Sequence, residues 1–167
     1  MGQYVVFKSH QQLFALPVEI VKRVIETEKF ISLPEVPDYI LGVYEYQEQM
    51  LPIVDLCKKL YNNFSPVTVD SKVILSQWKG RTMGIFVEEI IGIIVLQETD
   101  YAKDLDKAAL KHPYISKFLK MENEEVVIDL NLNYLFNDEQ EAEIVESLEA
   151  APAESGKEEN TEDAAEL

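Results

Sequence analysis

Short apolar segments separated by turn residues are the feature that most constrains the fold of this chain. Residues 4–7 and 13–16 are two such segments, and the polar turn His10-Gln11-Gln12 lies between them. The same form recurs later in residues 39–46 with 50–56, and in residues 72–78 with 82–87. Segments of this length that are rich in β-branched and aromatic residues predict strands joined in hairpins. We therefore expect a mainly β protein with short helices.

The two halves of the chain resemble each other. Residues 14–25 align with residues 83–94, and residues 52–56 align with residues 126–130. In each half a Val/Ile-Asp-Leu strand leads into a short helical pattern. One interpretation is two related lobes that lean on each other, because a lobe this small buries little surface alone. The other interpretation is a chance alignment of short apolar strands.

The turn-rich segment of residues 62–67 is the best candidate for a boundary between two lobes. We expect one domain over residues 1–137, with lobe one at about 16–66 and lobe two at about 71–137. The N-terminal strand region of residues 4–15 could be shared between the lobes.

The C-terminal part of the chain has a different composition. Residues 138–150 carry Ile144, Val145 and Leu148 at helical spacing among glutamates, which predicts a C-terminal helix. Residues 151–167 are charged and low in hydrophobicity, so they bury too little apolar surface to offset the entropy of ordering. We expect them to form a disordered acidic tail.

The charge of the chain argues against two classes of partner. The net charge is -16, and residues 138–167 hold 12 of the 31 acidic residues. Nucleic-acid binding needs clustered Lys and Arg, and so does a polybasic membrane anchor, so neither is expected. The apolar runs are far shorter than the roughly 20 residues that a membrane helix needs. One cysteine excludes an internal disulfide and is compatible with a reducing cytoplasm.

Residues that could carry chemistry have simpler structural interpretations. His10 and His112 have no partner at metal-ligand spacing and read as exposed loop histidines. Cys57 could be a nucleophile if a base lay near it, but a small buried side chain is the simpler interpretation. Asp55 and Asp129 hold equivalent places in the two halves, where capping a helix suits them better than acid–base catalysis. We expect no active site, metal or cofactor.

Four segments resemble the CheW-type coupling proteins of bacterial chemotaxis. They are residues 4–7, residues 15–21, the stretch from Pro-Asp-Tyr-Ile-Leu-Gly-Val at residue 37 to Leu-Pro-Ile-Val-Asp-Leu at residue 51, and residues 83–90. The resemblance covers about residues 4–137. It implies two SH3-like five-stranded β-barrel lobes with short helices and a C-terminal helix.

The resemblance also implies a function. A protein of this kind is a non-enzymatic cytoplasmic adaptor that couples chemoreceptors to the histidine kinase CheA. The cytoplasmic tip of the receptor docks at the groove between the lobes, and other surfaces bind the regulatory domain of CheA. A monomer outside the receptor array is the simplest expectation. The alternative is a divergent CheW-like scaffold for another kinase system, with altered or lost receptor binding. No group of residues in the sequence suggests an enzyme.

The residues expected on the receptor side include departures from the family pattern. Val21 and Gly42 match family positions tied to receptor binding. The family usually reads Ile-Asn-Leu-Arg-Gly at the following turn, where this chain has Tyr44-Glu45-Tyr46-Gln47-Glu48. Glu45 thus replaces Asn, Gln47 replaces Arg, and Arg23 stands at an often acidic position. Glu48 replaces the turn glycine, which suggests a different turn shape because a positive φ is costly for Glu.

These changes favour altered partner specificity, because charges at the rim of an interface decide which partners are tolerated. The alternative is neutral drift at a solvated turn.

The double substitution Glu45→Asn with Gln47→Arg restores the family pattern at the turn. We expect it to tighten binding to a standard chemoreceptor tip by several-fold, measured by calorimetry against the unaltered chain. An unchanged affinity would favour drift.

Overall fold

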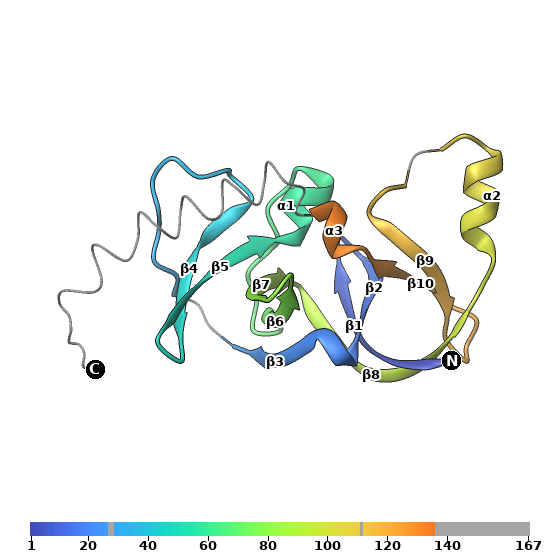
Figure 1. The fold of residues 1–167 in the computed structure, drawn as a ribbon, viewed down its shortest axis with the longest axis horizontal. Coiled ribbons are helices and arrows are strands. Elements are labelled where there is room, and N and C mark those ends of the chain that lie inside the picture. The colour runs from blue at the N-terminus through green and yellow to red at the C-terminus, as the bar shows by residue number, and fades with distance from the viewer. Residues whose placement is uncertain (27–28, 111, 136–167) are drawn as a thin grey trace.

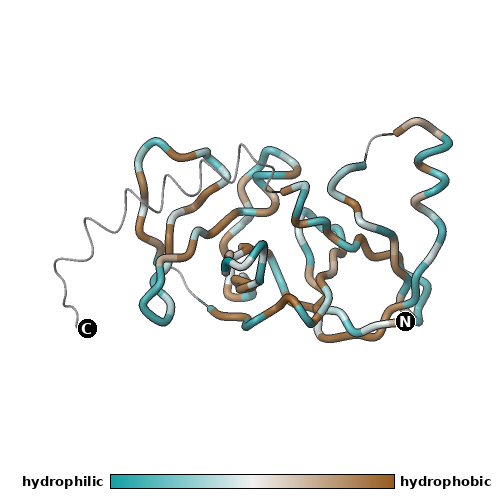
Figure 2. Tube along the Cα trace, in the orientation of Figure 1, coloured by the Kyte–Doolittle hydropathy of each residue, from teal (hydrophilic) through white to brown (hydrophobic). Residues whose placement is uncertain are grey.

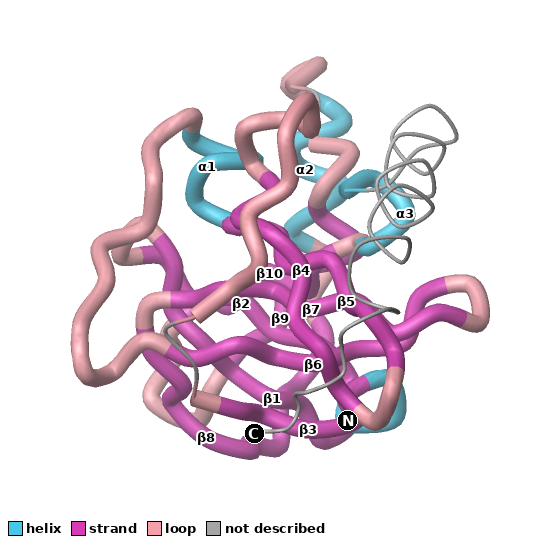
Figure 3. Tube along the Cα trace, turned by 90° about the vertical axis from the view of Figure 1, so that its left-hand side faces the viewer, coloured by secondary structure: helices cyan, strands magenta, loops and turns pink. Residues whose placement is uncertain are grey.

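The fold consists mainly of strands, which confirms the expected class (Figure 1). The computed structural model describes residues 1–26, 29–110 and 112–135. The strands in these residues are β1 (Gly2–Ser9), β2 (Gln12–Pro17), β3 (Val21–Ile25), β4 (Ile40–Tyr46), β5 (Gln49–Asp55), β6 (Lys72–Trp78), β7 (Arg81–Val87), β8 (Glu89–Glu98), β9 (Ile115–Lys120) and β10 (Val126–Leu130). The helices are η1 (Val18–Ile20), α1 (Leu56–Tyr61), α2 (Tyr101–Lys107) and α3 (Leu132–Leu135). Figure 3 shows α1, α2 and α3 gathered at one end of the strands.

The strands form two five-stranded units. Strands β1, β2, β10, β9 and β8 form a closed barrel, which we call the barrel lobe. Strands β3, β6, β7, β5 and β4 form the second sheet in that order, which we call the sheet lobe. A bridge between Ile31 and Val43 joins the segment after β3 to β4, the strand at the other end of the sheet.

The two lobes have the same topology, and each takes strands from both halves of the chain. In the barrel lobe, β2 lies antiparallel to β1 and parallel to β10. In the sheet lobe, β7 lies antiparallel to β6 and parallel to β5. Each lobe therefore joins the first two strands of one half to the last three strands of the other. This repeated topology supports the duplication read from the sequence.

The strand pairing does not follow the expected lobes of residues 16–66 and 71–137, because β6 and β7 share a sheet with β3, β4 and β5. The chain passes from the barrel lobe to the sheet lobe at Pro17–Ile20, between β2 and β3. It returns to the barrel lobe near Glu88, between β7 and β8. Strands β1 and β2 are not shared, because they pair only within the barrel lobe. Neighbours along the chain usually pair in space, so sequence order did not reveal this exchange. The expected helix of residues 138–150 and tail of residues 151–167 lie outside the described residues.

Three hairpins close through tight turns in which both central residues have positive φ. The pairs are His10 with Gln11, Gln47 with Glu48, and Lys79 with Gly80. This is the geometry of a type I′ turn, which matches the twist of the strands on either side. The altered turn shape expected at Glu48 is therefore wrong: Glu48 keeps a φ of 64°. The twist of β4 and β5 outweighs the steric cost of this φ.

The largest group of buried apolar side chains lies between the lobes. The barrel lobe contributes Phe7, Phe14 and Leu16, among others, and the sheet lobe contributes Ile74 and Ile85. The barrel lobe has its own smaller core around Val6 and Leu119, and the sheet lobe has one around Ile53 and Phe86. We call the largest group the inter-lobe core. The lobes therefore fold against each other rather than as separate units.

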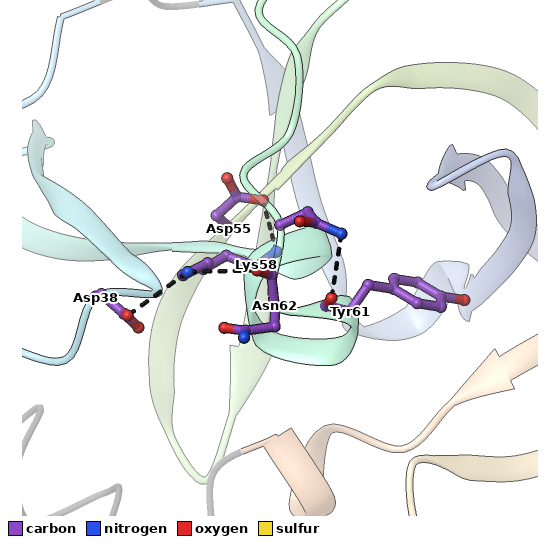
Figure 4. A network of polar contacts seen from close by, with 6 residues as sticks. Asp38, Asp55, Lys58, Tyr61 and Asn62 are labelled. Carbon is purple, nitrogen blue, oxygen red and sulfur yellow. Dashed lines mark hydrogen bonds and ion pairs between the residues drawn. The ribbon is translucent and has the colours of Figure 1, made fainter.

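Asp55 caps a helix, as the sequence predicts. Its buried carboxylate accepts a hydrogen bond from the backbone N–H of Lys58 in the first turn of α1, at 3.3 Å (Figure 4). It also accepts bonds from the N–H and the hydroxyl of Ser65, at 2.9 and 2.5 Å. These bonds fix the start of α1 and the loop that follows it.

Asp129 does not cap a helix, although it holds the equivalent place. Helix α3 begins at Leu132, and the side-chain oxygen of Asn131 accepts the hydrogen bond from the N–H of Asn133 instead. Asp129 is 5% exposed. Burial raises the pKa of its carboxyl to about 6, and the nearby Lys117 offsets this only in part. The helix begins later after β10 than after β5, which leaves this carboxylate buried without the capping role.

We expect Asp129→Asn to stabilise the fold at neutral pH. The native state holds a proton on this carboxyl more tightly than the unfolded chain does, so stability falls as pH rises from about 4 to about 6. Removing the charge should raise the free energy of unfolding by about 1–3 kcal/mol near pH 7, and by about half as much near pH 5. Urea denaturation at the two pH values measures this.

Asp55→Asn is the matched control and should have the opposite sign. It weakens hydrogen bonds that the ionised carboxylate accepts, and should cost about 1–3 kcal/mol near pH 7. A loss of stability in both variants would mean that Asp129 also makes a net stabilising interaction as a carboxylate.

Gly42 has a steric role. Its φ is 151°, and a Cβ at this position would overlap the carbonyl oxygen of Ile31. That carbonyl accepts a hydrogen bond from the N–H of Val43 at 2.9 Å. The missing side chain thus allows the segment after β3 to reach β4.

We expect Gly42→Ala to lower the free energy of unfolding by about 2–4 kcal/mol, from backbone strain and overlap together. Gly80→Ala is the control: its φ of 76° is also positive, but nothing lies within 4 Å of the added Cβ. It should cost about 1 kcal/mol from backbone strain alone. Equal losses in denaturant titrations would show that the overlap is relieved.

Candidate partner-binding surface

Strand β8 carries apolar side chains on both of its faces. Ile94 and Leu96 point into the core of the barrel lobe. On the opposite face Ile91, Ile93 and Val95 are exposed, and Ile93 is 67% exposed. A strand with one solvated face usually alternates apolar and polar residues. Contiguous exposed apolar side chains of this kind mark surfaces that bind other molecules.

Strand β3 lies along the same edge of the molecule as β8. Figures 1 and 3 both place the two strands at the lower edge, one from each lobe. Figure 2 shows hydrophobic residues along this edge. Val24 on β3 is also exposed. We call Val24, Ile91, Ile93 and Val95 the apolar edge. It follows the two strands with which the chain crosses from one lobe to the other.

Two of the expected receptor-side residues lie on β3. Val21 begins the strand, is partly buried and packs against the inter-lobe core. Arg23 is exposed and neighbours Val24. Both residues therefore lie on the strand that carries Val24, with Val21 packed inward and Arg23 exposed on the face opposite Val24.

The other three expected residues lie on the far strand of the sheet lobe. Gly42 is buried in β4 and offers no side chain to a partner. Glu45 is exposed on β4, and Gln47 is exposed in the turn that follows. Strands β3 and β4 stand at the two ends of the strand order of the sheet lobe, and the bridge between Ile31 and Val43 links the segment after β3 to β4.

Sequence reasoning missed the residues that dominate the apolar edge. Ile91, Ile93 and Val95 belong to a continuous apolar run over residues 90–96, interrupted only by Gly92. A run of this kind usually indicates a strand buried on both faces. The lack of apolar–polar alternation in this run was the available sign of an exposed apolar face, because the structure covers only one face of the strand.

Cys57 is a buried side chain, as expected, although the structure also brings a base near it. Its sulfur lies 3.8 Å from Nδ1 of His10, whose ring stacks on Tyr61. Burial raises the pKa of the Cys57 thiol, and the carboxylates of Asp55 and Glu88 raise it further. A thiol with a raised pKa is a poor nucleophile at neutral pH. The arrangement favours packing.

The described residues offer neither a metal site nor a membrane span. Within them, no group of three or more His, Cys, Asp or Glu residues is placed to hold a metal ion. None of their helices is long and apolar enough to cross a bilayer. His112, expected in an exposed loop, is partly covered, and its Nε2 lies 2.8 Å from the carboxylate of Asp106.

Known proteins resemble this chain over most of its length. The chemotaxis protein CheW of Rhizobium meliloti is 26% identical over 107 residues, which cover 64% of this chain and 69% of the relative. The chemotaxis protein CheW of Thermotoga maritima is 25% identical over 132 residues, which cover 79% of this chain and 85% of the relative.

A solved structure shares the fold. The crystal structure of the scaffolding protein TtCheW from Thermoanaerobacter tengcongensis superposes with a TM-score of 0.71 at 19% identity, covering 83% of this chain and 94% of that protein. The model of the CheW-like domain family matches residues 3–140. The chain therefore belongs to the CheW-like domain family.

Proposed function

We propose that this protein is a non-enzymatic adaptor that couples chemoreceptors to the histidine kinase CheA. Membership of the family and the likeness to chemotaxis CheW proteins support the assignment. The observation that carries the receptor half of the proposal is the apolar edge, where apolar side chains from both lobes stand uncovered. The protein would work in the cytoplasm, where receptor tips and the kinase are found.

The apolar edge has the dimensions of a helix-binding surface. Ile91 and Val95 are four residues apart on an extended strand, which places them about 13 Å from each other. Two turns of an amphipathic helix cover about 11 Å, and its apolar side chains recur every three or four residues. A chemoreceptor tip is helical, so one face of it would cover the edge, while Arg23 at the rim would select among receptors by charge.

A second uncovered apolar surface suits the kinase. The loop between α1 and β6 presents Phe64, Val67 and Val69, and Val69 is 91% exposed. The bonds from Ser65 to Asp55 hold this loop, and Lys58 lies over the ring of Phe64 at 4.7 Å. A loop ordered in advance loses little entropy on binding. We assign the regulatory domain of CheA to this loop surface.

Ile93→Ser and Val69→Ser test the two surfaces against each other. Removing an exposed apolar side chain that becomes buried on binding should cost about 1.5–3 kcal/mol, or about 10- to 100-fold in affinity. Ile93→Ser should weaken binding to a receptor-tip fragment and spare binding to the CheA regulatory domain. Val69→Ser should do the reverse. Calorimetry on the full chain measures both, and circular dichroism checks that each variant is folded.

The pattern of binding also separates the alternatives. Binding of the unaltered chain to the kinase alone would indicate a scaffold with changed or lost receptor binding. Binding to neither partner would mean that the family fold serves another purpose here. If both variants lose the same partner, the assignment of the two surfaces is wrong.

A further inference from the structure

We propose that the acidic segment of residues 138–150 docks as an amphipathic helix on the basic hairpin between β6 and β7. The hairpin carries Lys79 and Arg81. The proposal rests on where the described chain ends, on the length of the connection and on the charges at its two sides.

The described chain ends beside this hairpin. Leu135 is fully buried in the inter-lobe core. Two residues earlier, the side-chain oxygen of Asn133 accepts a hydrogen bond from the indole N–H of Trp78, at 3.1 Å. Trp78 is the last residue of β6 and directly precedes the turn at Lys79. The end of α3 is therefore fastened to the base of the hairpin.

The connection is short. Residues 136 and 137 separate Leu135 from residue 138, and an extended chain covers this interval with about 10 Å. A helix over residues 138–150 would be about 20 Å long. The segment must therefore begin within reach of the hairpin, in whichever direction it continues. A tether of this length gives an effective concentration in the millimolar range, so even a weak contact is populated.

The charges of the two sides are complementary. Residues 138–150 contain six acidic residues and no basic residue. The hairpin residues 79–81 contain two basic residues and no acidic residue. The Lys79 ammonium lies over the ring of Trp78 at 5.0 Å.

This placement matters because residues 1–137 are acidic as a whole, with 19 acidic and 14 basic residues. An acidic segment would be repelled by most of that surface. The segment also has an apolar stripe of Ile144, Val145 and Leu148, which gains by facing protein rather than water. The docked helix would turn this stripe toward the lobe and its carboxylates toward the basic hairpin.

Paramagnetic NMR on the full chain tests the docking. A nitroxide label is attached at Ser147→Cys in a Cys57→Ala background, which removes the other thiol. We expect the amide signals of Lys79, Gly80 and Arg81, with the Trp78 indole signal, to lose most of their intensity. In about 1 M salt, where the Debye length falls to about 3 Å, much of the intensity should return.

Charge reversal supplies the matched control. Lys79→Glu with Arg81→Glu should restore the hairpin signals that remain assignable, together with the Trp78 indole signal. Lys103→Glu with Lys107→Glu makes the same change of charge on α2 in the barrel lobe and should leave the broadening unchanged.

Three outcomes would overturn the proposal. Unbroadened hairpin signals would show that the segment does not dock there. Broadening centred on another element would place it elsewhere. A sample that mixes isotope-labelled chains with spin-labelled, isotope-free chains reports contacts between molecules, and broadening of the hairpin there would assign the contact to a second copy.

Discussion

The inter-lobe core is the interaction on which the rest of this structure depends. It draws Phe7, Phe14 and Leu16 from the barrel lobe and Ile74, Met83 and Ile85 from the sheet lobe. The cores inside each lobe are smaller. A five-stranded unit of this size buries only a modest apolar surface and is marginally stable alone. The exchange of strands answers the same constraint, because each lobe is complete only when both halves of the chain have folded. The lobes therefore hold a fixed relative position, which an adaptor needs if binding at one site is to position a partner at another.

The same exchange explains where the apolar edge lies. Strands β3 and β8 are equivalent strands of the two repeats, and each leads the chain from one lobe into the other. Strand β8 directs one face into the core of the barrel lobe, and the first residue of β3 packs against the inter-lobe core. The remaining apolar side chains of both strands stay at the surface. A binding surface at this place combines residues from both lobes, so its shape depends on the inter-lobe core. Substitutions in that core should then disturb partner binding without touching the partner.

The sequence predicted the fold class well, because the hairpins carry local signals. The three tight turns join the paired apolar segments from which the hairpins were predicted. Strand β9 was not predicted from the sequence, because Ile115–Lys120 is short, carries two lysines and does not alternate apolar with polar residues. The exchange of strands was missed because pairing between distant segments leaves no local trace. Among the expected site residues, Arg23 lies where a partner can reach it, whereas Gly42 serves the packing of a neighbouring segment. A family motif contains both partner-accessible residues and residues needed for packing. Only the structural surroundings of each residue distinguish the two roles.

An exposed apolar edge is a hazard as well as a proposed binding surface. Ile93 and its neighbours stand on a strand whose outward face has no polar residue between positions 90 and 96, and such strands promote association between copies of a protein. The charge of the chain opposes this, since a net charge of -16 makes copies repel one another at long range. Charge repulsion is screened beyond about 8 Å at physiological ionic strength, so it delays chance encounters but does not block a partner that fits the edge closely. Under the proposed function, the acidic residues therefore keep unmatched copies apart, while the apolar edge binds a partner whose apolar face is complementary.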